Sequence, residues 1–266
     1  MNIKLFILTL LSFWGSGIFA QDQLTYKSKN LPENDTVWVF KPQQYQSGQT
    51  LPLIFLLHGY SGNYKQWDSI MDAQKYADEF GIIIVCPDGL FNSWYLNSPV
   101  KSNWQYESFF FDELYPDILK KYTPDKQKIF ITGLSMGGHG AMYLFIQKPE
   151  LFAGAGSTSG GIKLSDGYGK WELAGLLGNP AKDDEIWQKY SVIDNIERLK
   201  GNQKPIIFDC GASDFFYASN NELKQKCDSL KLNATYISQP GAHNRVYWAK
   251  SIRQQFTFFK SKINQE

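Results

Sequence analysis

A serine flanked by glycines follows a buried, strand-like run of sequence. The run Ile129-Phe130-Ile131-Thr132 leads into Gly133-Leu134-Ser135-Met136-Gly137, which has the pattern Gly-x-Ser-x-Gly, and helix-like sequence comes next. In this context the serine occupies a strained turn between strand and helix, where its hydroxyl is exposed and the helix N-terminus favours developing negative charge. The pattern predicts that Ser135 is a nucleophile. The alternative is a glycine-rich turn without a chemical role.

A serine hydroxyl is a weak nucleophile near neutral pH and needs a base within hydrogen-bond reach. The chain has three histidines. His139 follows Ser135 by four residues on the same predicted helix and is directed along that helix. His58 ends a strand, where a polar side chain more often braces a turn. His243 lies in a loop after the last predicted strand, and a nucleophile, acid, histidine order along the chain is the one expected with such a turn. We therefore predict His243 as the general base; the alternative is a surface loop histidine.

A third group must hold the imidazole in the correct tautomer and stabilise its protonated form. The segment 206–214 offers two carboxylates. Asp209 falls within the strand-like run, whereas Asp214 lies beyond its carboxyl end and could reach His243. We favour Asp214 and keep Asp209 as the alternative. Four aspartates between about 160 and 200 are interpreted as solvated charges: Asp166, Asp183, Asp184 and Asp194.

Attack on a carbonyl also needs donors aimed at the developing oxyanion. These are usually the backbone N–H after the nucleophile and one from the first strand-to-helix loop. Met136 supplies the first. The loop His58-Gly59-Tyr60 supplies the second, with Tyr60 favoured and Gly59 as the alternative.

The elements that must position these groups alternate along the chain. A continuous apolar run over 51–57 indicates a strand buried on both faces. Strands alternating with helices mean parallel pairing through crossover helices, so we expect a three-layer α/β/α sandwich with a mostly parallel sheet and the site beyond the strands' carboxyl ends. Strands are expected at 37–40, 51–57, 82–86, 128–132, 152–157, 205–210 and 234–238, and helices at 70–80, 110–121, 136–147, 222–230 and 246–261.

The alternation lapses between about 160 and 200, in a Trp-rich segment that is longer than an ordinary connection. We interpret this segment as a small cap inserted into one catalytic domain that spans 21–266.

The first residues have the layout of a secretory signal peptide. Lys4 precedes an apolar run over 5–13, and small residues including Ala20 follow. The apolar run is shorter than the roughly 20 residues that span a bilayer. We therefore predict cleavage after Ala20 and a secreted or periplasmic protein without stable membrane insertion.

Composition excludes some classes of partner and cofactor. Apolar residues make up 43% and charged residues 20%, enough for a globular core, and the net charge of +1 gives no reason to expect nucleic acid as a partner. The three cysteines can form at most one disulfide and are interpreted as buried small hydrophobic residues: Cys86, Cys210 and Cys227. Their spacing matches no metal site, and we expect no metal and no cofactor.

These motifs, taken together, resemble a known family. The chain is similar from about 51 to 259 to the esterase D-like family of the α/β-hydrolase fold, which includes tributyrin esterases, S-formylglutathione hydrolases, feruloyl and acetyl-xylan esterases, and mycolyl transferases. The resemblance implies the triad Ser135, His243 and Asp214, and it implies that Trp94 and Tyr95 lie near the substrate cleft; their alternative role is ordinary core packing. The likeness is carried by His58-Gly59-Tyr60-Ser61-Gly62-Asn63, Pro87-Asp88-Gly89, Ser93-Trp94-Tyr95, Gly133 to Ala141, Cys210 to Asp214 and Gly241-Ala242-His243.

We therefore expect a serine esterase that acts through an acyl-enzyme on short-chain acyl esters, including acetyl or feruloyl esters on polysaccharide. Export argues against an intracellular thioester substrate. The substrate partner is a small-molecule or polysaccharide-linked ester. The alternatives are acyl transfer to a sugar acceptor, and a non-catalytic binding protein on the same fold. The oligomeric state does not follow from the sequence.

Overall fold

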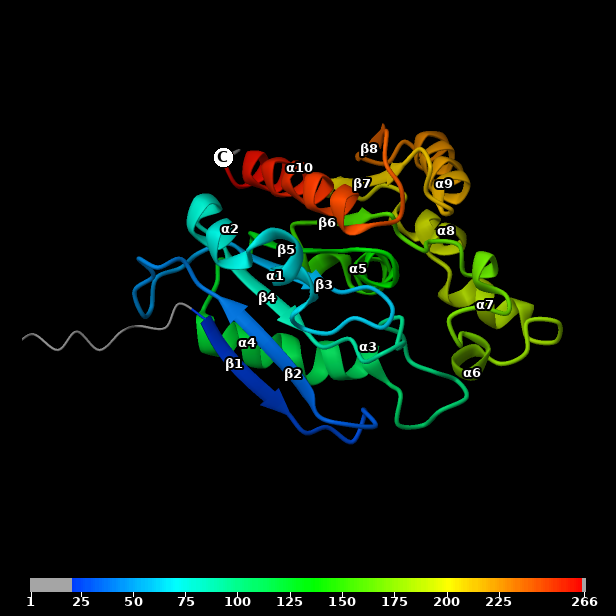
Figure 1. The fold of residues 1–266 in the computed structure, drawn as a ribbon, viewed down its shortest axis with the longest axis horizontal. Helices are drawn as coiled ribbons and strands as arrows, with labels where there is room; N and C mark the ends of the chain where they lie inside the picture. The colour runs from blue at the N-terminus through cyan, green and yellow to red at the C-terminus, as the bar shows by residue number, and fades with distance from the viewer. Residues whose placement is uncertain (1–20, 265–266) are drawn as a thin grey trace, which may run out of the picture.

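A twisted sheet of eight strands forms the centre of the computed structural model, which describes residues 21–264 (Figure 1). The strand order is β1-β2-β4-β3-β5-β6-β7-β8. Strands β3 to β8 run parallel, whereas β2 pairs antiparallel with both β1 and β4. The bounds are β1 Gln21–Tyr26, β2 Asp35–Phe40, β3 Leu53–Leu57, β4 Ile83–Pro87, β5 Ile129–Gly133, β6 Gly154–Thr158, β7 Ile206–Gly211 and β8 Ala234–Gln239. The mostly parallel sheet is confirmed.

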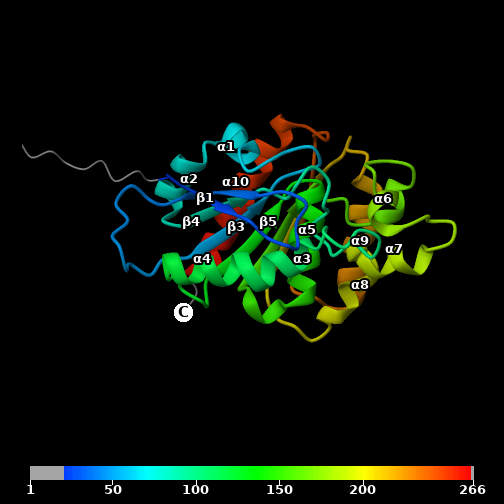
Figure 2. The same ribbon diagram turned by 90° about the horizontal axis from the view of Figure 1, so that it is seen from below.

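Helices cover both faces of the sheet (Figures 1 and 2). On one face, α1 (Gln66–Met71), α2 (Ala73–Phe80) and α10 (Arg245–Ile263) bury Trp67, Phe80 and Phe256 in one hydrophobic cluster. The other face carries α3 (Tyr106–Phe109), a π-helical turn (Phe110–Leu114), α4 (Tyr115–Tyr122), α5 (Met136–Gln147) and α9 (Tyr217–Ser229). The predicted three-layer α/β/α sandwich is therefore confirmed.

The central strands are buried because their sequences are apolar on both sides. Every residue of β3, β4 and β5 is buried. In the register of β3 and β5, Leu57 lies opposite Gly133. The loops that follow these two strands begin at His58 and at Leu134. They therefore lie side by side at the carboxyl ends of the parallel strands.

Several element boundaries differ from the sequence-based expectation. The helix expected over 70–80 is divided at Asp72, whose φ of 53° ends α1 and whose side chain accepts the Lys75 N–H to cap α2. Strand β1 was not predicted, because it lies at the sheet edge and its alternating exposed and half-buried residues carry little apolar signal. The helix expected over 110–121 begins earlier, at Tyr106.

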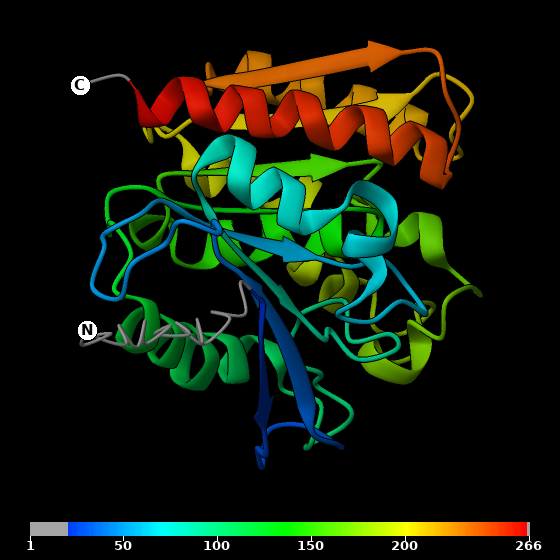
Figure 3. The same ribbon diagram turned by 60° about the vertical axis from the view of Figure 1, so that its left-hand side comes forward.

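The segment between β6 and β7 stands at the end toward which the parallel strands point (Figure 3). It consists of short helices and turns: Leu164–Gly167, α6 (Ala174–Leu177), α7 (Asp184–Tyr190), α8 (Val192–Asn195) and Ile196–Leu199. This is the region expected to form a cap over 160–200, and its anchors include the buried Trp187.

All three cysteines are buried thiols, as predicted: Cys86, Cys210 and Cys227. Burial raises the pKa of each thiol, to about 12 for Cys227. Within residues 21–264, no helix is long and apolar enough to cross a membrane. The predicted leader, residues 1–20, lies outside the described residues.

Candidate active site

Ser135 occupies the sharp turn between β5 and α5. Its backbone has φ 54° and ψ −116°, an unfavourable conformation for a residue with a side chain. The turn is held by the Ser135 N–H, which donates to the Thr158 carbonyl at 3.0 Å. Glycines are required on both sides, since a Cβ on Gly133 would lie 2.4 Å from the Gly137 oxygen and one on Gly137 would lie 2.2 Å from the Leu57 oxygen. The sequence thus fixes a strained turn that presents the serine hydroxyl.

His243 contacts that hydroxyl. Its Nε2 lies 2.9 Å from Ser135 Oγ, and its Nδ1 lies 2.9 Å from Asp214 Oδ2. A carboxylate can only accept, so Nδ1 carries the proton and Nε2 accepts the Ser135 O–H. The geometry thus aligns a hydroxyl donor, an imidazole base and a carboxylate.

The loops after β7 and β8 bring Asp214 to His243. Their pairing continues past the strands, because Ala212 donates to the Gln239 carbonyl and Ser213 donates to the Gly241 carbonyl. The Asp214 side chain is wholly buried, and its Oδ1 accepts the Phe216 N–H at 2.9 Å. The structure therefore brings together the three side chains expected from the sequence.

Asp209, the alternative acid, has a different set of partners. Its carboxylate is fully buried and accepts hydrogen bonds from Thr158 (2.6 Å), Tyr247 (2.9 Å) and Gln255 (2.7 Å). Burial raises the pKa of Asp209, and these hydrogen bonds oppose that rise. Through these hydrogen bonds Asp209, in β7, connects α10 with β6. The loops that carry Asp214 and His243 come after β7 and β8.

The other two histidines brace neighbouring backbone. His58 Nε2 accepts the Gly89 N–H at 2.6 Å, so its Nδ1 donates to the Gly59 carbonyl at 2.8 Å. His139 is fully buried between the carbonyls of Trp94 (3.1 Å) and Tyr190 (2.9 Å). Burial lowers the pKa of His139 to about 4, and the two carbonyl contacts oppose that shift; a neutral ring can donate to only one of the two carbonyls. Neither histidine contacts Ser135 Oγ.

Two backbone N–H groups beside Ser135 have no acceptor among residues 21–264, those of Tyr60 and Met136. The Gly59 N–H, by contrast, donates to Gln66 Oε1 at 2.8 Å. The loop approaches the nucleophile closely, since a Cβ on Gly59 would lie 3.4 Å from Ser135 Cβ. The N–H groups of Tyr60 and Met136 are therefore free to bind an acceptor, whereas that of Gly59 already donates to Gln66.

A small pocket of about 170 Å³ opens onto Ser135 and His243. Aromatic side chains form much of its wall, and Phe215 among them is 61% exposed at the surface. Pockets that hold a whole drug-sized ligand measure roughly 300–1,000 Å³. This pocket can therefore enclose one small group of a substrate. Its lining residues are Gly59, Tyr60, Gln66, Trp94, Leu134, Ser135, Trp171, Phe215, His243 and Trp248.

Trp94 and Tyr95, both expected near the cleft, occupy different places. Trp94 lines the pocket, whereas Tyr95 is fully buried, does not line it, and donates to the His58 carbonyl at 3.0 Å. The expectation that Tyr95 forms part of the substrate cleft is corrected accordingly, and its role is the alternative one, core packing: its ring fills the space beside Gly89 and Gly140, where a Cβ would collide with it. Both residues have positive φ, 50° and 61°, so the backbone is strained here.

Four pocket residues were not singled out from the sequence: Gln66, Trp171, Phe215 and Trp248. Phe215 directly follows Asp214, and Trp248 lies one turn into the helix after His243. Each is therefore close in sequence to a predicted residue. Trp171 belongs to the Trp-rich segment between about 160 and 200. Gln66 had no sequence signal, because its contact with Gly59 depends on how α1 packs.

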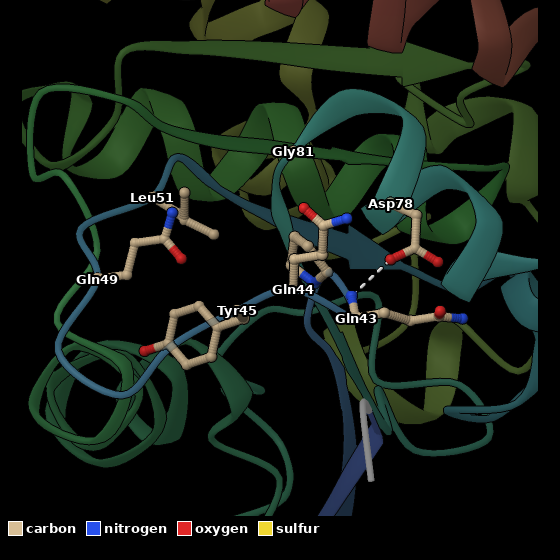
Figure 4. Close-up of a pocket in the computed structure, with 8 residues that line it drawn as sticks. Gln43, Gln44, Tyr45, Gln49, Leu51, Asp78 and Gly81 are labelled. Carbon is tan, nitrogen blue, oxygen red and sulfur yellow. Dashed lines mark hydrogen bonds between the residues drawn. The ribbon is translucent and has the colours of Figure 1, made fainter. Parts of the chain in front are cut away.

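A larger hollow of about 420 Å³ lies at the opposite end of the sheet, before β3 and β4. Figure 4 shows its glutamine side chains with Tyr45 and Asp78, whose Oδ1 accepts the Gln43 N–H. Its lining pairs no nucleophile with a base, so it is not the candidate active site. Across the part of the chain that the structure describes, no group of three or more His, Cys, Asp or Glu side chains could hold a metal ion.

Comparisons with known proteins show the family of this chain. The family model described as "Putative esterase" matches residues 28–259. The chain is 25% identical to an acetyl esterase of Caldicellulosiruptor saccharolyticus, over 91% of this chain and 98% of that protein. It is 26% identical to the S-formylglutathione hydrolase of Mus musculus, over 79% and 82% of the two chains.

Solved structures share the fold over nearly the whole chain. A ferulic acid esterase superposes with a TM-score of 0.76 at 25% identity, covering 91% of this chain and 97% of that one. The fluorophosphonate-binding serine hydrolase F of Staphylococcus aureus superposes with a TM-score of 0.78 at 20% identity, covering 91% and 98%.

The chain belongs to the esterase family that this model describes, and it is a serine esterase with an α/β-hydrolase fold. The esterase D-like resemblance is thus confirmed, and the non-catalytic alternative is set aside.

Proposed function

We propose that this protein hydrolyses esters of short acyl groups through a Ser135–His243–Asp214 triad and an acyl-enzyme intermediate. The observation that carries the proposal is the unbroken chain of contacts from Ser135 Oγ through His243 to Asp214, at 2.9 Å for each step. A nucleophile, its base and the group that orients the base are the minimum set for covalent acyl transfer to water.

In the first step, Ser135 Oγ attacks the ester carbonyl carbon as His243 Nε2 takes its proton. Negative charge develops on the carbonyl oxygen, where the free N–H groups of Tyr60 and Met136 stabilise it. Asp214 stabilises the imidazolium that forms. His243 then gives its proton to the leaving alkoxide, and the alcohol departs from the acyl-enzyme.

In the second step, His243 Nε2 takes a proton from a water molecule, which attacks the acyl carbon. The same two N–H groups stabilise the second tetrahedral oxyanion. Its collapse breaks the bond to Ser135 Oγ, which takes back the proton from His243. The acid product leaves and the resting site is restored; the chain's own residues supply every proton transfer.

The pocket supports a small acyl group as the enclosed part of the substrate. The acyl group stays bonded to Ser135 through both steps, whereas the alcohol leaves after the first, so a pocket of about 170 Å³ against Ser135 serves the acyl group. The alcohol then lies at the rim, where Trp171 and the exposed Phe215 stack with ring centroids 5.9 Å apart. Flat aromatic surfaces of this kind suit a sugar or phenolic alcohol, including one linked to polysaccharide.

We also propose that the enzyme works outside the cytoplasm, as a secreted or periplasmic protein. The support is the leader-like pattern of residues 1–20. Expression in the native host, followed by fractionation and intact mass, tests this; a mature chain that begins at Gln21 is expected, and a full-length chain in the cytoplasm would contradict it.

A panel of p-nitrophenyl esters from acetyl to octanoyl tests the proposed activity. The kcat/KM is expected to be highest for the short acyl groups, and Ser135→Ala should lower it by orders of magnitude for every ester. Unchanged turnover in Ser135→Ala would overturn the mechanism, and a maximum at octanoyl would overturn the acyl size. Product analysis with a sugar acceptor present identifies acyl transfer if ester on the sugar exceeds free acid.

A further inference from the structure

One side-chain hydrogen bond connects the loop after β4 with the inserted segment that follows β6. Asn92 Nδ2 donates to Glu172 Oε2 at 2.7 Å, across 80 residues of sequence. Asn92 is 3% exposed, whereas Glu172 lies at the surface. A hydrogen bond to a carboxylate is stronger than one between two neutral groups. The contact therefore fixes the Glu172 side chain against a part of the protein that is itself buried.

The residue before Glu172 belongs to the wall of the pocket beside the nucleophile. Trp171 lines that pocket and is only half-buried, so its ring is accessible to a ligand. The ring packs against three others at the site, with centroid distances of 5.9 Å to Trp94, 5.3 Å to Phe216 and 5.9 Å to Phe215. Because Trp171 and Glu172 are adjacent, a contact that fixes Glu172 also restrains the backbone that carries the Trp171 ring.

The turn that carries Trp171 is strained. The Leu173 N–H closes it by donating to the Lys170 carbonyl at 3.2 Å, and its two central residues, Trp171 and Glu172, have φ of 51° and 56°. Turns with two central residues of positive φ are dominated by Gly, Asn and Asp, none of which is present here. A strained backbone persists only where surrounding contacts determine it. The hydrogen bond from Asn92 to Glu172 is such a contact.

We propose that Asn92 and Glu172 are positioning residues for the alcohol part of the substrate. Their hydrogen bond holds Trp171 in the pocket wall, where its ring and that of Phe215 contact the alcohol. The pair thereby sets a preference for aromatic or sugar alcohols over small aliphatic ones. This inference rests on the proposed function, which places the alcohol at the rim beside Trp171 and Phe215.

The physical basis of this preference is the amount of alcohol surface that meets the ring. Without the hydrogen bond, the turn can leave its strained conformation and Trp171 can move out of the wall. An aromatic alcohol then loses a ring contact of a kind that changes affinity by about 2- to 10-fold. An ethyl group has much less surface to place against that ring, so its ester loses less.

Two acetyl esters that differ only in the alcohol test this role: p-nitrophenyl acetate and ethyl acetate, with turnover of the second followed by pH-stat. The measured quantity is the ratio of kcat/KM for p-nitrophenyl acetate over ethyl acetate. Dividing the wild-type ratio by the variant ratio cancels the shared acyl group and the intrinsic reactivities of the two esters. For Asn92→Leu and for Glu172→Ala, we expect this quotient to be about 5. The loss should appear as a higher KM for p-nitrophenyl acetate, with kcat within about twofold of wild type.

Glu172→Gln separates the hydrogen bond from the charge. Its amide oxygen can still accept from Asn92, so its quotient should stay below about 2. An equal quotient for Glu172→Gln and Glu172→Ala would overturn the proposal.

Glu222→Ala is the matched control. Glu222 Oε2 accepts from Lys163 Nζ at 2.7 Å, which is another side-chain contact of the inserted segment and does not involve the turn at Trp171. Its quotient is expected to stay near 1. A quotient equal to that of Glu172→Ala would show that any loosening of the segment suffices, and it would overturn the proposal.

Combination with Trp171→Ala tests whether the pair acts through the tryptophan. Asn92→Leu should not raise the quotient further in a chain that already carries Trp171→Ala, and a further rise would overturn the proposal. Quotients near 1 for Asn92→Leu and Glu172→Ala, with Ser135→Ala inactive, would overturn the positioning role alone, whereas full activity of Ser135→Ala would overturn the proposed function. Glu172 lies at the surface, so Glu172→Ala decides the question should Asn92→Leu not fold.

Discussion

Asp214 holds His243 by a buried contact, with Oδ2 of the carboxylate 2.9 Å from Nδ1 of the imidazole. The carboxylate side chain has no exposed surface, and its other oxygen is fixed by the Phe216 N–H. The imidazole therefore has one stable tautomer, the one in which Nε2 can accept the Ser135 proton.

Asp214→Asn should abolish the preference of His243 for the tautomer that carries its proton on Nδ1. The amide can present an N–H to His243 Nδ1, which favours the tautomer with Nε2 protonated and unable to accept from Ser135. We expect kcat on p-nitrophenyl acetate to fall roughly 10⁴-fold with little change in KM. A fall of less than tenfold would show that Asp214 does not orient the base.

Asp209→Asn should act on stability first. The carboxylate accepts hydrogen bonds from Thr158, Tyr247 and Gln255. An asparagine amide would place its own N–H donors opposite one of these donors, so that one hydrogen bond would be lost. We expect the free energy of unfolding to fall by about 3 kcal/mol, measured as a shift of the urea midpoint. Asp228→Asn is the matched control, because that carboxylate is 61% exposed and should change stability by less than about 0.5 kcal/mol. Equal effects of the two changes would contradict the role of Asp209.

The sequence sufficed for the elements with strong local signals. Continuous apolar runs predict β3, β4 and β5, and the glycines around Ser135 predict the turn. The edge strand β1 has no such run, and its pairing with β2 depends on the tertiary fold. Asp72 divides a helix that periodicity alone would continue, because its backbone is left-handed, with φ 53°, and its side chain caps the second helix.

The candidate site was predictable wherever a residue's role follows from its position after a strand. Asp214 was separated from Asp209 on that basis, and the contacts agree. Tyr95 was expected beside the substrate cleft but is buried in the core. Two adjacent aromatic residues on a strained turn, Trp94 and Tyr95, point to different environments, and no sequence pattern reveals this. Gln66 and Trp171 reach the pocket from elements that are remote in sequence from Ser135, so only the fold places them.

Gln66→Leu should weaken catalysis without touching the triad. Gln66 Oε1 accepts the Gly59 N–H, which fixes the loop that presents the Tyr60 N–H. Removal of one oxyanion donor costs about 10²–10³-fold in kcat, and loosening its loop should cost less, about 10- to 100-fold. The measurement is kcat and KM on p-nitrophenyl acetate. Gln74→Leu on the neighbouring helix α2 is the control and should retain wild-type kcat. An unchanged kcat in Gln66→Leu would show that Gln66 does not support the loop that presents the Tyr60 N–H.

His139→Gln should flatten the dependence of stability on pH. Burial lowers the pKa of His139 to about 4 from 6.5, so the unfolded chain binds this proton more readily than the folded one. The stability that neutral His139 allows is therefore present above pH 6.5 and is lost as the pH falls from 6.5 toward 4, by on the order of 3 kcal/mol.

Urea unfolding of wild type and His139→Gln between pH 4 and pH 7 measures this difference. The wild-type stability should fall more steeply on acidification than that of the variant. Parallel curves for the two proteins would mean that His139 is not held neutral in the folded state.

The central claim is that Ser135 carries the acyl group. Acid quench of the enzyme during turnover of p-nitrophenyl acetate, followed by peptide mapping by mass spectrometry, measures this directly. We expect an acetyl adduct on the peptide that contains Ser135, absent from Ser135→Ala. An adduct on another residue, or wild-type turnover by Ser135→Ala, would contradict the account.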